Sequence, residues 1–197
     1  MNLKLLATTV LAAVGLLVAP AYAGVDELRI GAVHNVRLDH GDLVDGKEGD
    51  NIEAELVFDS PDFLNILGSP RPYLVGSGNL EGNTSFGGVG LLWRWNIAHH
   101  WAIEPGFGYI IHNGERDNPY PDGTPQAAAF EDEHQLLGSR DLFRTTLALE
   151  REFGPHSGVQ LYYEHMSHGQ ILDRGRNQGF DAVGLRYVWR FNPDPAE

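Results

Sequence analysis

The chain has 197 residues, carries a formal net charge of −13 and contains no cysteine. The acidic balance argues against nucleic acid as a partner, because nucleic-acid binding requires clustered Lys and Arg. The absence of cysteine excludes a disulfide framework and a thiol nucleophile.

Residues 1–23 have the pattern of a secretory signal peptide. Lys4 precedes the apolar run Leu5–Val18, and Ala21-Tyr22-Ala23 supplies a small-residue cleavage site. The apolar run is shorter than the roughly 20 residues that a transmembrane helix needs. We therefore divide the chain into a signal peptide, 1–23, and one domain, 24–197.

Within the domain, apolar and polar residues alternate with a period of two, in stretches broken by turn-rich clusters, and this pattern predicts β-strands. Many of the stretches are near the ~9–11 residues that a tilted strand needs to cross a bilayer. In chain order, the predicted strands are 27–38, 51–60, 71–80, 84–97, 101–112, 136–153, 158–167 and 180–191. The acid-rich segments 39–50 and 117–133 are expected to lie in solvated loops.

The connections between these strands differ in length, as in bacterial outer-membrane barrels with long extracellular loops and short periplasmic turns. Long polar connections at 40–50, 113–133 and 168–179 are interleaved with short ones at 97–100 and 154–157. We predict an all-β fold, an eight-stranded antiparallel up-and-down transmembrane β-barrel in the outer membrane of a Gram-negative bacterium. A soluble periplasmic lipocalin-like barrel is the alternative, because it has the same periodicity.

Barrel topology assigns faces to three polar residues near the C-terminus. His165 and Ser167 share one face, because side chains two apart on a strand do so, and Asp181 heads the apolar face of the last strand. All three should point outward, where an unpaired charge facing lipid is costly. A hydrogen-bonded triad would explain them, with Ser167 as nucleophile, His165 as base and Asp181 orienting the imidazole. The alternative is that they are ordinary polar residues at the membrane interface.

The segment His165-Met166-Ser167-His168-Gly169, followed by Asn177-Gln178-Gly179-Phe180-Asp181, resembles the lipid A 3-O-deacylase (PagL-type) family. The family pattern is His-x-Ser-Asn-Ala, then Asn-x-Gly-x-Glu before the last strand. The stretches 79–82, 138–140 and 143–144 also look like the family. The resemblance implies an outer-membrane serine esterase, a carboxylic ester hydrolase that removes an ester-linked acyl chain from lipid A. It implies His165 as base, Ser167 as nucleophile and Asp181 as orienting acid, with no metal and no cofactor.

Two departures from the family pattern concern the chemistry. Asp181 is one methylene shorter than the family's usual Glu. His168 and Gly169 stand where the family has Asn and Ala, and that Asn helps to form the oxyanion hole. We therefore expect oxyanion stabilisation from His168 and Gly169, through the imidazole or through nearby backbone N–H groups.

Two arginines, Arg174 and Arg176, lie in the adjoining loop and could clamp the phosphates of lipid A, because guanidinium suits that geometry. The alternative is two solvated loop side chains. The expected partner is lipid A of lipopolysaccharide in the outer leaflet, and the oligomeric state is left open. The rival function is a non-catalytic barrel for adhesion or envelope integrity. A phospholipase would share the same chemistry.

Other charged residues are assigned no chemistry. His99 and His100 are adjacent, so they would face opposite ways on a strand, and no carboxylate stands at a useful offset for a metal site. Glu104 and Glu164 fall on faces assigned to the lumen, where buried charges need partners. Their expected partners are Arg144, Arg186 and Arg190.

Overall fold

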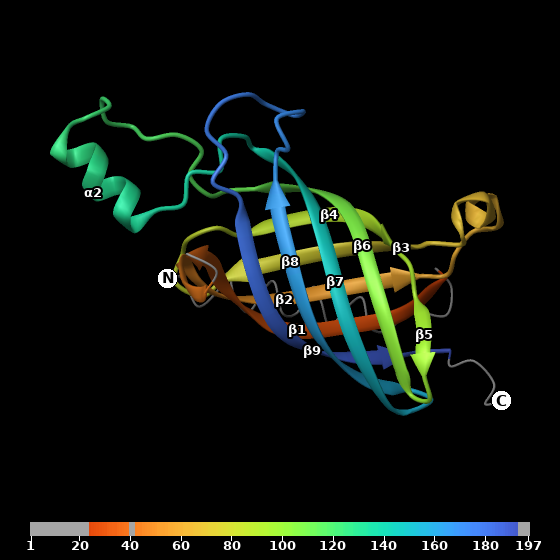
Figure 1. The fold of residues 1–197 in the computed structure, drawn as a ribbon. Helices are drawn as coiled ribbons and strands as arrows, with labels where there is room; N and C mark the ends of the chain where they lie inside the picture. Colours follow the sequence, from red (N-terminus) through yellow and green to blue (C-terminus); the bar gives the residue numbers. More distant parts are fainter. Residues whose placement is uncertain (1–23, 40–41, 193–197) are drawn as a thin grey trace, which may run out of the picture.

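The alternating segments form one antiparallel sheet that closes on itself (Figure 1). The computed structural model describes residues 24–39 and 42–192, so the predicted signal peptide, 1–23, lies outside the described residues. The strands are β1 (Val25–Asp39), β2 (Asp42–Phe58), β3 (Arg71–Asn79), β4 (Phe86–Leu92), β5 (Trp95–Ala98), β6 (Trp101–His112), β7 (Asp141–Gly154), β8 (Ser157–Ser167) and β9 (Phe180–Arg190). A 3-10 helix, η2 (Asp62–Leu67), and an α-helix, α2 (Pro125–Glu133), lie between strands. Within the described ranges, no helix is long and apolar enough to cross a membrane.

The sheet closes because two of its strands share one neighbour. Its order is β4-β3-β2-β1-β9-β8-β7-β6-β5, and β4 also pairs with β6. β4 and β5 are therefore one barrel strand interrupted at residues 93 and 94, and the nine segments make the predicted eight-stranded barrel. Arg94 lies at this interruption and points toward the lumen, where its guanidinium lies 2.7 Å from both Glu104 and Glu150.

The barrel has two unlike ends. The loop end carries the connections 80–85, 113–140 and 168–179, whereas the turn end carries η2 and the short connections 99–100 and 155–156. Figure 1 shows α2 standing away from the barrel at the loop end and η2 at the opposite end. Outer-membrane barrels place long loops outside the cell and short turns in the periplasm.

Charged side chains fill the lumen. Arg29 and Arg144 are fully buried, and they lie 2.9 Å from Glu104 and 2.7 Å from Glu164, respectively. The predicted pairing of Glu164 with Arg144 is confirmed, whereas the prediction for Glu104 is wrong, because Glu104 pairs with Arg29 and Arg94. An eight-stranded barrel has an interior that side chains fill, and charges buried there require partners. Exposed apolar side chains cover the outer wall, among them Ile30, Leu74, Val89, Phe107, Leu147, Leu161 and Leu185.

The first acid-rich segment was predicted to be a loop, and that prediction is wrong for most of its length. β2 begins at Asp42, and its first residues pair with the end of β1 as a hairpin. His34 Nδ1 lies 2.7 Å from Asp50 Oδ1, and Nε2 lies 3.3 Å from Asp45 Oδ1. Cross-strand pairing of charges thus stabilises a strand where a solvated loop was expected.

The second acid-rich segment contains α2 and is not a loop throughout. The Thr124 side chain accepts a hydrogen bond from the Ala127 N–H at 3.2 Å, and Pro125 is the first helical residue. Both features are signals for the start of a helix. Leu136 and Leu137 were predicted to begin a strand, but they are fully buried in the connection before β7.

Candidate active site on the outer wall

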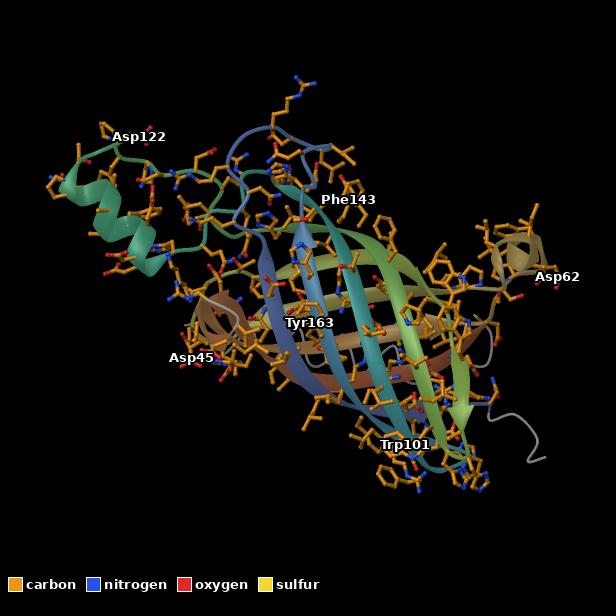
Figure 2. All side chains as sticks on the ribbon, in the orientation of Figure 1. Asp45, Asp62, Trp101, Asp122, Phe143 and Tyr163 are labelled. Carbon is orange, nitrogen blue, oxygen red and sulfur yellow. The ribbon has the colours of Figure 1, made fainter. Side chains whose placement is uncertain are left out.

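Strand β8 presents its side chains alternately to the two faces of the barrel. Toward the lumen, Tyr162 and Glu164 are 1% and 0% exposed, whereas Leu161 and Tyr163 are 58% and 39% exposed. His165 continues the outward series, because side chains two apart share a face. Figure 2 shows Tyr163 on the wall formed by these strands, between the two ends of the barrel.

His165 and Asp181 are brought together by strand register. They are direct partners in the β8–β9 pairing, and His165 Nδ1 lies 2.8 Å from Asp181 Oδ1. Directly opposed residues have Cβ atoms about 4.5–5.5 Å apart, so an aspartate is long enough to reach the ring. Because a carboxylate only accepts hydrogen bonds, Nδ1 carries the proton and Nε2 is the basic nitrogen.

A third side chain, Tyr163, joins this pair, and it was not singled out from the sequence. Its hydroxyl donates a hydrogen bond to Oδ1 of Asp181, the oxygen that also faces His165. Tyr163 lies diagonally across the strand pair from Asp181, a separation that aromatic side chains can span. The sequence does contain one indication of this role: Tyr163 lies two residues before His165, so its phenol is on the same face of the strand.

Ser167 is the last residue of β8 and follows His165 on the outer face. Its partner in the β7–β8 pairing is Phe143, whose ring stacks on Phe107 with centroids 5.5 Å apart. Among residues 24–39 and 42–192, no hydrogen bond joins Ser167 to His165. Contacts between nucleophile and base are often long in unliganded sites and tighten with substrate. The structure thus pairs His165 with Asp181, and Ser167 follows two residues after His165 on the same face of β8.

Immediately after Ser167, the side chain of His168 is fully buried. Its Nε2 donates to the carbonyl oxygen of Arg176 at 2.9 Å, and its Nδ1 accepts from the N–H of Gln170 at 3.2 Å. Both ring nitrogens therefore form hydrogen bonds within the loop 168–179, and neither is free to donate a hydrogen bond to an oxyanion near Ser167. In the described part of the chain, the backbone N–H groups of His168 and Gly169 donate no hydrogen bond.

The two loop arginines differ in their partners. Arg176 Nη1 lies 2.7 Å from Glu131 Oε1 on α2, and Asn118 Nδ2 donates to the same oxygen at 3.1 Å. The hydrogen bonds from Asn118 and Arg176 lower the pKa of Glu131 below its usual value. Arg174 is exposed, and its guanidinium has no partner among the residues that the structure describes. Arg174 is thus the arginine left available for an anionic group.

The loop 168–179 is anchored to neighbouring segments. The N–H of Leu136 donates to Gln178 Oε1 at 2.7 Å, and the N–H of Gln178 donates back to the Leu136 carbonyl at 3.3 Å. On the other side, Asn35 Nδ2 donates to the carbonyl oxygen of Asp181 at 2.9 Å. The backbone around Asp181 is therefore held by the connection before β7 and by β1.

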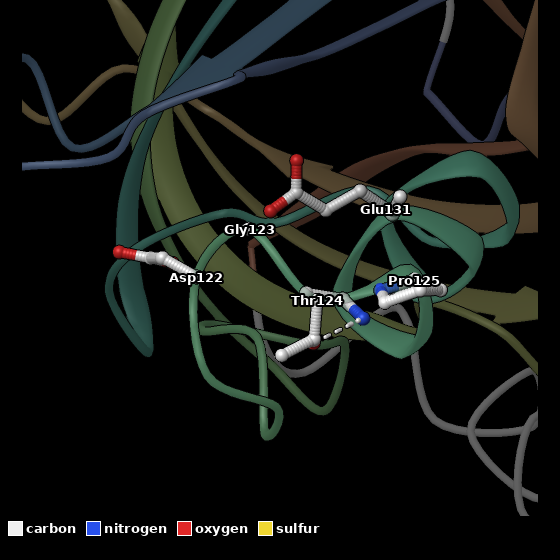
Figure 3. Close-up of a pocket in the computed structure, with 7 residues that line it drawn as sticks. Asp122, Gly123, Thr124, Pro125 and Glu131 are labelled. Atoms are coloured by element: carbon white, nitrogen blue, oxygen red, sulfur yellow. Dashed lines mark hydrogen bonds between the residues drawn. The ribbon is translucent and has the colours of Figure 1, made fainter.

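Two hollows on the protein surface lie away from His165, Ser167 and Asp181. One of about 350 Å³ lies beside α2 (Figure 3), and its lining includes Asp122, Gly123, Thr124, Pro125 and Glu131. An apolar groove of about 300 Å³ on the outer wall is lined by Leu28, Ile30, Tyr187, Trp189 and Phe191. Neither includes His165, Ser167 or Asp181. Within the described ranges, no group of three or more His, Asp and Glu side chains could hold a metal ion.

The fold and its loops define the class of protein: an eight-stranded β-barrel of the outer-membrane type. The crystal structure of the outer membrane enzyme PagL aligns with a TM-score of 0.57 at 15% identity, over 82% of this chain and 98% of that chain. Neisserial surface protein A aligns with a TM-score of 0.52 at 9% identity, over 84% and 96% of the two chains. A de novo designed transmembrane β-barrel gives 0.50 at 7% identity, over 85% and 95%. At these identities the matches establish the fold.

The family follows from the sequence. The profile of the family described as lipid A 3-O-deacylase (PagL) matches residues 67–190, which include His165, Ser167 and Asp181. The chain belongs to the lipid A 3-O-deacylase family, as the resemblance predicted. No sequence among curated proteins matches it significantly.

Proposed function

We propose that this chain is a serine esterase that hydrolyses the 3-O-linked acyl ester of lipid A in the outer leaflet of the outer membrane. Ser167 is the nucleophile, His165 the base and Asp181 the acid that orients the imidazole. The proposal is carried by the 2.8 Å contact between His165 Nδ1 and Asp181 Oδ1, on a face that Ser167 shares. Membership of the deacylase family supports the reaction class.

Acylation begins with transfer of the Ser167 hydroxyl proton to His165 Nε2, while Oγ attacks the ester carbonyl carbon. Asp181 holds the Nδ1–H tautomer and stabilises the imidazolium that forms. The tetrahedral intermediate then collapses, the bond between the acyl carbon and the sugar 3-oxygen breaks, and the imidazolium returns its proton to that oxygen. The acyl chain is now an ester of Ser167.

Deacylation repeats these steps with water as the nucleophile. His165 Nε2 removes a proton from water, the resulting oxygen attacks the acyl-enzyme carbon, and the fatty acid leaves as Ser167 regains its proton. We assign stabilisation of the oxyanion to the backbone N–H groups of His168 and Gly169, because they donate to no other group in the described residues. The imidazole of His168 is not assigned this role, because both of its nitrogens form hydrogen bonds within the loop 168–179.

The outer wall suits a substrate that never leaves the membrane. Lipid A lies in the outer leaflet, and a site near the loop end of a lipid-facing wall meets its acyl esters at that depth. An ionisable pair facing lipid is costly and calls for a functional reason. We assign the binding of a lipid A phosphate to Arg174, because its side chain is exposed and its guanidinium has no partner in the described residues.

The test is mass spectrometry of lipid A from cells that express the full chain, Ser167→Ala or Ser157→Ala. Ser157 begins β8 at the turn end, so it is a matched control on the same strand. We expect the wild type and Ser157→Ala to remove one hydroxyacyl group, and Ser167→Ala to remove none. Unchanged lipid A with all three proteins, each folded in the outer membrane, would instead support a non-catalytic barrel. Loss of a fatty acid from glycerophospholipids alone would indicate a phospholipase.

A further inference from the structure

We infer that Tyr163 is a positioning residue of this site, which holds the Asp181 carboxylate in the orientation that serves His165. The inference rests on the proposed esterase function. Tyr163 Oη donates to Asp181 Oδ1, and His165 Nδ1 lies 2.8 Å from the same atom. One carboxylate oxygen therefore receives both donors, from two outward positions of a single strand.

The geometry explains why an aspartate benefits from a second donor. The terminal torsion of an aspartate is broad, so a single hydrogen bond leaves the carboxylate free to rotate. In the described residues, the other carboxylate oxygen of Asp181 has no partner. The phenol of Tyr163 restricts the rotation that would turn Oδ1 away from His165.

The chemistry of the surface favours a phenol for this role. A carboxylate on an apolar wall is destabilised unless hydrogen bonds compensate for lost water. Tyr163 supplies such a bond without adding a charge, and its ring remains compatible with lipid because tyrosine combines an apolar body with a polar tip. A lysine or arginine at this position would instead compete with His165 for the carboxylate.

The placement of Tyr163 also separates its role from substrate binding. Along β8 the outward order is Tyr163, His165, Ser167, so Tyr163 lies on the far side of the base from the nucleophile. Four residues of strand correspond to about 13 Å. Tyr163 should therefore act on the reacting atoms only through Asp181 and His165, and its loss should change kcat and leave KM unaltered.

The experiment compares kcat and KM for lipid A in mixed micelles, using the purified wild type, Tyr163→Phe and Tyr187→Phe. Tyr187 is an outward tyrosine on β9 that lines the apolar groove, so its variant controls for loss of a wall hydroxyl. We expect Tyr163→Phe to lower kcat about 10-fold, as for loss of a hydrogen bond to a charged group. KM should be unchanged, and Tyr187→Phe should match the wild type.

The same comparison in an Asp181→Asn background tests the route of action. If Tyr163 acts through the carboxylate, Tyr163→Phe should cause no further loss there. Wild-type kcat in Tyr163→Phe, or an equal loss in both backgrounds, would overturn the inference. A folded wild type that does not hydrolyse lipid A would instead refute the proposed function, so the two failures are distinguishable. Phenylalanine keeps the ring, and gel mobility before and after heating verifies that each barrel is folded.

Discussion

His165 of β8 and Asp181 of β9 are direct partners across a strand pair, and their side chains meet at 2.8 Å. The contact is a consequence of register, because a slip of one residue would turn Asp181 into the lumen. The pairing of β8 with β9 in the barrel wall therefore holds the two side chains together.

Asp181→Asn should lower kcat for lipid A by roughly 10³- to 10⁴-fold, because the amide can present a donor to Nδ1 and select the wrong tautomer. Asp181→Glu, which restores the usual acid of the family, is the matched control and should retain most of the activity. Initial rates on folded protein measure both. Equal activity of the Asn variant and the wild type would show that Asp181 does not orient the base.

Gly138→Ala should reduce the proposed deacylase activity although Gly138 is not a residue of the proposed triad. Gly138 has a φ of +76°, and a Cβ there would lie 1.8 Å from the Arg176 carbonyl oxygen and 3.0 Å from His168 Nε2. The loop 168–179 would have to move. Gly123→Ala is the matched control, because Gly123 has a φ of +75° but open space around its Cβ. Equal rates of lipid A hydrolysis in Gly138→Ala and Gly123→Ala would show that the position of the loop 168–179 does not affect activity.

The contact between α2 and the loop 168–179 should loosen in acid. The pKa of Glu131 is lowered from 4.5, so the Glu131–Arg176 bond is fully present above about pH 4.5 and is lost as the pH falls below that through the lowered pKa. Because the chain lacks cysteine, a dye on Ala129→Cys reports the motion of α2 by anisotropy. Glu131→Gln should show the acid-state anisotropy at neutral pH.

The control for this prediction is Glu133→Gln, an exposed carboxylate on the same helix. It should keep the wild-type anisotropy at neutral pH and the same acid transition. An acid transition that persists unchanged in Glu131→Gln would show that another group releases α2.

Arg144→Met should strongly destabilise the barrel. Arg144 lies in the lumen 2.7 Å from Glu164, and its removal leaves the buried Glu164 carboxylate without its ion-pair partner in the described residues, whereas Glu55 keeps Arg29 and Arg186. A loss of about 3–5 kcal/mol in the free energy of unfolding is expected for a broken buried pair. Arg151→Met, which removes an arginine stacked on Trp101 at 5.4 Å, should cost about 1 kcal/mol or less. Denaturant titration followed by gel mobility compares the two.

The barrel and the faces of its strands could be predicted because a pleated strand ties each side chain to a side by its position alone. Strand alternation alone thus predicts that His165 and Asp181 lie on one wall of the barrel. The same alternation puts His168 on the lumen side with Glu164 and Met166, where it is buried. The family pattern favours the ring of His168 as an oxyanion donor, but that ring bonds the loop, and the backbone N–H of His168 donates to no group in the described residues.

The loop end could not be predicted in the same way, because contacts between distant segments decide it. His34 pairs with Asp50 and extends a hairpin. The N–H of Leu136 donates to the side chain of Gln178, although β7 and β8 separate the two residues in the sequence. Tyr163 was on the predicted outward face, but only atomic positions show that its hydroxyl reaches Asp181. Local periodicity carries no information on such pairings.

The ion-paired lumen, with Arg29 and Arg144 fully buried in it, also governs how molecules reach and leave the protein. A filled eight-stranded barrel provides no pathway for solutes. If the wall carries the reaction, lipid substrate and fatty-acid product must both arrive and depart by lateral diffusion. The permeability barrier of the host membrane is thereby preserved, and turnover depends on the fluidity of the surrounding leaflet.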